Sequence, residues 1–183
     1  MPRITAIDPA AATGAARNLL DAVQAKLGLT PNLMRTLANA PSALKGYLDL
    51  NGALASGVLD HKFREEIALA VAQANSCVYC LAAHTALGTL AGLTPDEIVQ
   101  SRGARSLDPR RRAGLQFAQA VVINRGQVSD ASLAAVREAG FSDAEITEIV
   151  ANVVLNIFTN YINQVAQTTV DFPPVTVVLP AAA

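Results

Sequence analysis

Start and stop signals for α-helices recur along almost the whole chain, and they constrain its fold more than any other sequence feature. Asp60 precedes a stretch of apolar residues at helical spacing, and Pro95 directly follows Thr94. Ser142 stands three positions before Glu145, as in a capping box. Glycines close several of the periodic stretches. The pattern predicts helices over residues 13–27, 31–38, 41–57, 61–75, 77–91, from 94 onward, 108–124, 129–138 and 142–169.

The composition also favours close-packed helices. Of the 183 residues, 51% are hydrophobic, only 4% are aromatic and none is Trp. Alanine and leucine dominate, whereas β-sandwiches are rich in β-branched and aromatic residues. A chain of this length can bury a core within one domain. We therefore expect one compact all-α multi-helix domain over residues 1–183, in which Pro173 and Pro174 begin an extended tail at about 171–183.

The low charge of the chain limits its partners. Charged residues make up 16% of the chain and the formal net charge is −1, so no basic patch indicates nucleic-acid binding. No apolar run approaches the roughly 18 residues that span a bilayer, and residues 1–9 carry no signal-peptide pattern. We expect a cytoplasmic protein that binds neither nucleic acid nor membrane. Because so few charges are available to cover its surface, we also expect a homo-oligomer.

The chemistry is expected at the only two cysteines, Cys77 and Cys80, with His84 four positions after the second. Such thiols can close an internal disulfide, and in a reducing compartment the pair is more typical of catalysis or metal binding than of a cross-link. On one helix, offsets of three and seven residues place the three side chains within about 60° of one another. Cys77 would lie in the first turn, where free N–H groups lower a thiol pKa, and His84 could relay a proton. The pattern supplies a nucleophile, a resolving thiol and a base.

Other interpretations of these residues stay open. Two ordinary buried cysteines would have the same spacing, and the CxxC pair with its histidine offers three acceptable zinc ligands, with His61 as a fourth. Side chains from one helix enclose a metal poorly, so we expect no metal site and expect His61 to face solvent. Glu65 and Glu66 are typical of the charged first turn of a helix. Tyr79 could serve in packing alone.

The stretch from Arg64 to His84 resembles the core motif of the alkylhydroperoxidase AhpD-like branch of the carboxymuconolactone decarboxylase family. The resemblance rests on Glu65 twelve positions before Cys77, on the CxxC pair itself and on the histidine that follows it. The combination is far more specific than a CxxC pair alone. The resemblance extends more weakly into the C-terminal half and is weakest before about residue 31.

The resemblance implies a thiol-dependent alkylhydroperoxidase with an all-α fold, assembled as a trimer or hexamer. In this family pattern Cys80 would be the peroxidatic thiol and Cys77 its resolving partner. Glu65 and His84 would form the proton relay, and Tyr79 would be a supporting residue. Because twelve helical residues put Glu65 about 120° from the cysteine stripe, the chain must break between them.

The expected break is at Asn75–Ser76, inside a redox core that spans about 41–92. The resemblance further implies a hydroperoxide substrate and no tightly bound cofactor. The disulfide would be reduced by an external dithiol such as dihydrolipoamide. A lipoyl-protein or a peroxiredoxin is the protein partner that this cycle would use.

Two other function classes stay open. A carboxymuconolactone decarboxylase-like lyase would not need its cysteines, although the non-redox decarboxylases of the family lack the cysteine pair. A non-enzymatic oligomer that responds to oxidation or to zinc would bind metal or change its assembly without consuming peroxide.

Overall fold

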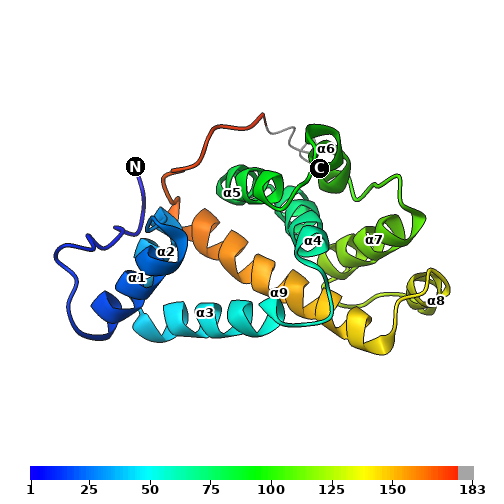
Figure 1. Cartoon of the computed structure of the whole chain (residues 1–183), viewed down its shortest axis with the longest axis horizontal. Helices are drawn as coiled ribbons and strands as arrows, with labels where there is room; N and C mark the ends of the chain where they lie inside the picture. Colours follow the sequence, from blue (N-terminus) through cyan, green and yellow to red (C-terminus); the bar gives the residue numbers. More distant parts are fainter. Residues whose placement is uncertain (177–183) are drawn as a thin grey trace.

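The computed structural model describes residues 1–176, and within them all regular secondary structure is helical (Figure 1). The expected all-α fold class is confirmed. Of the expected tail, residues 171–176 carry no helix, and 177–183 lie outside the described residues. The helices are α1 (Gly14–Leu27), α2 (Asn32–Leu37), α3 (Pro41–Ala55), α4 (His61–Ala74), α5 (Val78–Leu90), α6 (Pro95–Arg102), α7 (Pro109–Ile123), α8 (Asp130–Glu138) and α9 (Asp143–Ala166).

The helices begin at the predicted capping residues. Asp60 Oδ1 accepts the backbone N–H of Phe63 at 2.8 Å, and Ser142 and Glu145 form a complete capping box. The predicted end of α9 is wrong: the helix stops at residue 166 instead of 169, because Gln167 adopts a left-handed conformation with φ 48°. None of the described helices has the length and hydropathy needed to span a bilayer.

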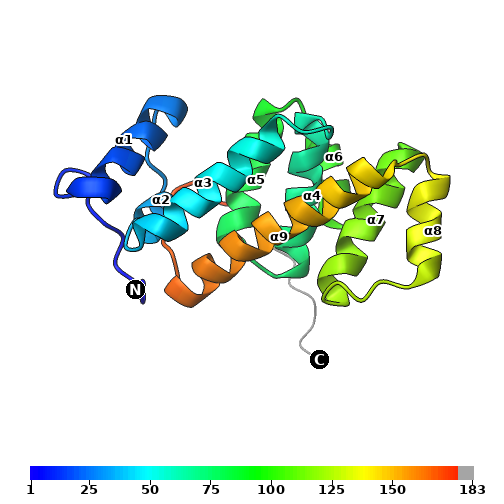
Figure 2. The same ribbon diagram turned by 90° about the horizontal axis from the view of Figure 1, so that it is seen from below.

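Helix α4 lies at the centre of the helix packing, where it contacts α5, α6, α7 and α9. Helix α9 runs from α8 at one end of the molecule towards α1 and α2 at the other, and α3 packs along it (Figures 1 and 2). Because α9 crosses most of the molecule, its side chains can reach elements that are far apart in the sequence.

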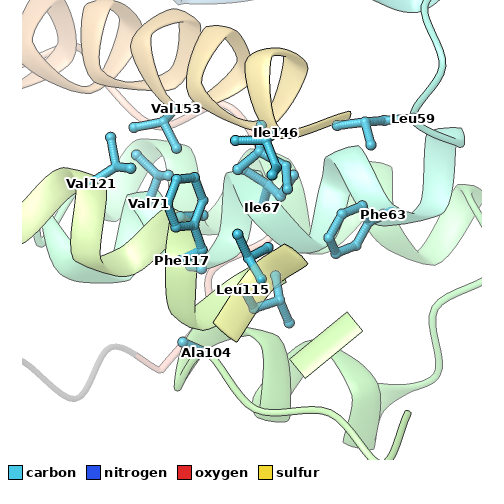
Figure 3. Close-up of a cluster of buried hydrophobic side chains, with 14 of the residues drawn as sticks. Leu59, Phe63, Ile67, Val71, Ala104, Leu115, Phe117, Val121, Ile146 and Val153 are labelled. Carbon is cyan, nitrogen blue, oxygen red and sulfur yellow. The ribbon is translucent and has the colours of Figure 1, made fainter. Parts of the chain in front are cut away.

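One hydrophobic core joins α4, α7 and α9 (Figure 3). A glycine lets α7 approach α4 closely. A Cβ atom on Gly114 would lie 2.6 Å from Cζ of Phe63 and 2.8 Å from Cζ of Phe141. Members of this core include Phe63, Ile67, Val71, Leu115, Phe117, Val121, Ile149 and Val153.

A second hydrophobic core joins the first three helices to α5, and both cysteines belong to it. The buried leucines of α1, α2 and α3 thus help to keep water away from the thiols. Its members include Leu20, Val23, Leu33, Leu37, Leu44, Cys77, Tyr79, Cys80 and Leu81.

The sequence indicated that Glu66 lies in the charged first turn of a helix, but the structure buries this side chain on α4. It is 2% exposed and pairs with Arg111 of α7, which also contacts Asp60 at 3.0 Å. Burial raises the pKa of Glu66, and the Arg111 guanidinium only partly offsets this effect. Glu66 follows Phe63 by three positions, so helical periodicity places both on the inward face of α4.

Candidate active site

A sharp break separates α4 from α5 at the position that the sequence predicted. Asn75 ends α4, and Ser76 adopts a left-handed conformation with φ 55°. The backbone N–H of Cys77 then donates to the carbonyl of Ala72 at 2.9 Å. This turn lets α5 pack back against α4, so that residues from the two helices meet in one site.

The sequence predicted that Cys77 lies in the first turn of α5. In the structure Cys77 is instead the N-cap residue, directly before that turn. Its Sγ accepts the backbone N–H of Cys80 at 3.4 Å. Both cysteines are free thiols, 1% and 2% exposed respectively, and their sulfur atoms lie 2.6 Å apart. Since a disulfide is about 2.05 Å long, closing one needs only a small movement of the side chains.

The surroundings of the two sulfur atoms shift the pKa values of the two thiols in opposite directions. The hydrogen bond with the Cys80 thiol lowers the pKa of Cys77, and the Cys80 backbone N–H and the charge of His84 act in the same direction against burial. The Cys77 thiol and burial raise the pKa of Cys80. The first thiolate of the reduced pair therefore forms at Cys77, at the positive end of α5.

Glu65 and His84 form a close pair across the α4–α5 contact. His84 Nδ1 lies 2.8 Å from Glu65 Oε2, and the side chains are 19% and 12% exposed. Burial lowers the pKa of His84, but the Glu65 carboxylate more than offsets this and the net direction is upward, which the negative charge of Cys77 reinforces. The imidazole thus holds a proton more firmly than a free histidine does.

The sequence did not reveal that Glu65 lies between two histidines. Its other oxygen, Oε1, is 3.7 Å from Nε2 of His61, one helical turn earlier on α4. The His61 side chain is 62% exposed, in agreement with the expectation that it faces solvent. Among residues 1–176, no group of three or more His, Cys, Asp or Glu side chains is arranged to hold a metal ion.

Asparagines of α9 form a part of the site that the sequence analysis missed. Asn163 Nδ2 donates to Cys80 Sγ at 3.3 Å, and Asn160 Oδ1 accepts from Asn75 Nδ2 at 2.9 Å. Both α9 side chains are buried. The available signal was the spacing of Asn152, Asn156, Asn160 and Asn163, which repeats on one face of an otherwise apolar helix.

Two tyrosines border the site in different ways. The Tyr79 hydroxyl accepts the backbone N–H of Leu33 at 3.1 Å, and its ring meets Phe172 edge-on at 5.7 Å, so this residue joins α5 to α2 and the tail. Tyr47 of α3 packs against the core that contains the cysteines. Burial, with the nearby charges of Glu65 and Cys80, raises the pKa of Tyr47 to about 12. Sequence reasoning gave no signal for Tyr47.

A groove of about 280 Å³ opens beside the cysteine pair, between the start of α5 and the end of α9. Of the two thiols, Cys77 lines this groove. The opposite wall is formed by Asn163 and Gln164 of α9 and by Thr168 and Val170, which follow that helix.

Comparisons with known proteins agree with this architecture. Residues 41–120 match the model of the carboxymuconolactone decarboxylase family. The alkylhydroperoxidase AhpD core structure of a peroxidase-related protein from Ralstonia eutropha JMP134 is 29% identical, with a TM-score of 0.83 over 93% of this chain and 92% of that chain. A peroxidase-related protein from Silicibacter sp. TM1040 is 26% identical, with a TM-score of 0.77 over 90% of this chain and 91% of that chain.

A more distant likeness concerns the fold alone. The debrominase Bmp8 is 17% identical, with a TM-score of 0.78 over 92% of this chain and 91% of that chain. No curated protein sequence matches the chain.

Proposed function

We propose that this chain is a thiol-dependent alkylhydroperoxidase of the carboxymuconolactone decarboxylase family, with an AhpD-like core, as the family match over residues 41–120 supports. It reduces hydroperoxides through a dithiol–disulfide cycle of Cys77 and Cys80. One observation carries the proposal: two free thiols lie 2.6 Å apart beside a partly buried Glu65–His84 pair. The thiol pair supplies a reversible two-electron couple, and the Glu65–His84 pair can hold and release the protons that the reaction needs.

In the proposed first step, the Cys80 thiolate attacks the hydroperoxide. The resting proton of Cys80 passes to Cys77, with which it shares a hydrogen bond, and Asn163 Nδ2 stabilises the sulfur that becomes charged. The Cys80 sulfur then bonds to the terminal oxygen, the O–O bond breaks, and the leaving alkoxide takes a proton from protonated His84. The products are a sulfenic acid on Cys80 and an alcohol.

In the second step, Cys77 resolves the sulfenic acid. Cys77 loses its proton to the His84–Glu65 pair and attacks Cys80, and hydroxide leaves with that proton as water. The dithiol has then lost two electrons to the hydroperoxide, which becomes one alcohol and one water. An external dithiol, for which dihydrolipoamide is our candidate, returns the electrons by thiol–disulfide exchange. The donor in the cell would be a lipoyl-protein, and a peroxiredoxin would be a partner that takes electrons from the reduced cysteine pair.

The proposal extends to assembly and location. Four apolar side chains form an exposed stripe along α9, which supports a homo-oligomer, either a trimer or a hexamer, that covers them. They are Val150, Val154, Tyr161 and Val165. We place the protein in the cytoplasm, where thiols are kept reduced between turnovers.

Peroxide consumption with dihydrolipoamide as reductant tests the proposal. We compare the wild type with Cys77→Ser and Cys80→Ser, and expect turnover only in the wild type. With Cys77 replaced, the Cys80 sulfenic acid should persist and react with dimedone. Turnover by the wild type no faster than by either variant would overturn the peroxidase assignment. A carboxymuconolactone decarboxylase-like lyase, in contrast, would keep its activity in Cys80→Ser.

A further inference from the structure

The groove beside the cysteines gives access to one sulfur atom of the pair. Cys77 lines the groove at the start of α5, whereas Cys80 lies one helical turn deeper and contacts Asn163 of α9. In the disulfide form, a molecule that occupies the groove would therefore meet the Cys77 sulfur first. Thiol–disulfide exchange depends on which sulfur can be attacked and on how well the other sulfur leaves as a thiolate.

Two polar atoms at the groove are buried and have no hydrogen-bond partner within residues 1–176. They are Oδ1 of Asn163 and Oγ1 of Thr168. Asn163 is 4% exposed, and both residues line the groove. A buried carbonyl oxygen without a partner costs free energy unless a ligand or water satisfies it. The pair of unsatisfied oxygens thus indicates a ligand that carries hydrogen-bond donors.

We propose that this groove is the docking site of the external dithiol, which attacks Sγ of Cys77 and releases Cys80 as the thiolate, with Asn163 as the residue that positions and stabilises this leaving group. The inference rests on the proposed dithiol–disulfide cycle and adds its reductive half. The ligand is a small dithiol with a hydrogen-bond donor, such as an amide N–H or its second S–H, directed at Asn163 Oδ1 and Thr168 Oγ1.

The exchange balances without any further reactant. The thiolate of the dithiol bonds to Cys77 Sγ, the Cys77–Cys80 bond breaks, and both electrons of that bond leave on Cys80. The second thiol of the ligand loses its proton to the Cys80 thiolate and attacks the ligand sulfur bound to Cys77. The ligand leaves as a cyclic disulfide, and Cys77 returns as the thiolate that the reduced site favours.

Asn163 can serve this exchange with both ends of its amide. Its Nδ2 already donates to Cys80 Sγ at 3.3 Å, and a hydrogen bond to sulfur strengthens when the sulfur becomes an anion. Its Oδ1 faces no other partner within the described residues and is free to accept from the ligand. One residue thereby links the arrival of the reductant to the departure of Cys80.

Mapping the mixed disulfide tests which sulfur is attacked. Wild-type protein is oxidised with diamide, which forms the disulfide without peroxide, then treated with excess 2-mercaptoethanol and quenched with N-ethylmaleimide. Cys77 and Cys80 share the tryptic peptide 65–102, so fragmentation must place the two modifications. We expect mercaptoethanol on Cys77 and maleimide on Cys80. The reverse pattern would overturn the inference and leave peroxide turnover unaffected.

Rates of reduction by dihydrolipoamide, measured on the same diamide-oxidised protein, test Asn163. Asn163→Leu keeps the volume but removes the donor, and we expect the reduction to slow roughly tenfold or more. The matched control is Asn152→Leu, which removes another buried amide of α9, one that donates to the carbonyl of Glu148. The control should keep the wild-type rate. Equal rates for wild type and Asn163→Leu, with both folded by circular dichroism, would contradict the assigned role.

Thr168→Val tests the ligand side of the groove. Losing one hydroxyl that binds the ligand should raise the half-saturating dihydrolipoamide concentration roughly threefold to tenfold, with the maximal rate unchanged. An unchanged half-saturating concentration would remove Thr168 from the docking site. Because the disulfide is formed without peroxide, these results hold whether or not the protein turns over hydroperoxides.

Discussion

Replacing Glu65 with glutamine should disable the proton relay while keeping the shape of the site. The carboxylate lies 2.8 Å from His84 Nδ1, and both side chains are mostly buried. A hydrogen bond to a charged group of this kind contributes about 1.5–3 kcal/mol. If it is lost in the transition state, the oxidative step should slow by about 10- to 150-fold.

The pH dependence gives the same prediction a second readout. The pKa of His84 is raised above its ordinary value by Glu65, so the pair stabilises the folded state fully below the ordinary histidine pKa and loses that effect as pH rises through the raised pKa. Glu65→Gln should therefore lower the pKa of His84. The stability difference from wild type should be larger at pH 6 than at pH 9.

Stopped-flow oxidation of the reduced thiols measures the rate, and a histidine NMR titration follows His84. The control is Glu66→Gln, the same chemical change one residue later, where the carboxylate pairs with Arg111 instead. The Glu66→Gln control should destabilise the fold but leave the pKa of His84 unchanged. A Glu65→Gln variant with the wild-type rate and an unmoved His84 titration would refute the relay.

Three further substitutions test the fold and the site. Arg111→Met leaves Glu66 buried without its cation and should cost about 3–5 kcal/mol in urea unfolding, whereas exposed Arg112→Met should change little; a loss below about 1 kcal/mol would contradict the burial of this pair. Gly114→Ala should destabilise by about 1–3 kcal/mol, while Gly46→Ala, with nothing within 4 Å of its Cβ, should stabilise α3, as thermal melts would show. Tyr47→Phe should slow thiol oxidation roughly threefold to tenfold, because it removes a protonated hydroxyl that lies near Glu65 and Cys80; an unchanged rate would exclude Tyr47 from the site.

Local sequence signals predicted the helices well because capping and periodicity are local effects. Asp60, Thr94 and Ser142 each cap the helix that the sequence placed after them. Local signals failed where tertiary packing decides the outcome. Glu66 stands in a charged stretch that is typical of a helix start. Because it follows Phe63 by three positions, however, it lies on the same inward face of α4 and pairs with Arg111.

The site was predictable only in part for a similar reason. Cys77, Cys80 and His84 follow one another along the sequence, so their spacing alone indicated redox chemistry. Asn163 stands 83 positions beyond Cys80 and meets it only because α9 crosses the molecule. Tyr47 reaches the site through the packing of α3, which no spacing in the sequence encodes.

A thiol count before and after one equivalent of an alkyl hydroperoxide tests the central claim most directly. Reduced protein should show two free thiols and, after the reaction, none, with one alcohol formed per chain and the Cys77–Cys80 disulfide found by mass spectrometry. If both thiols survive while the hydroperoxide remains, the cysteine pair does not carry out the proposed cycle.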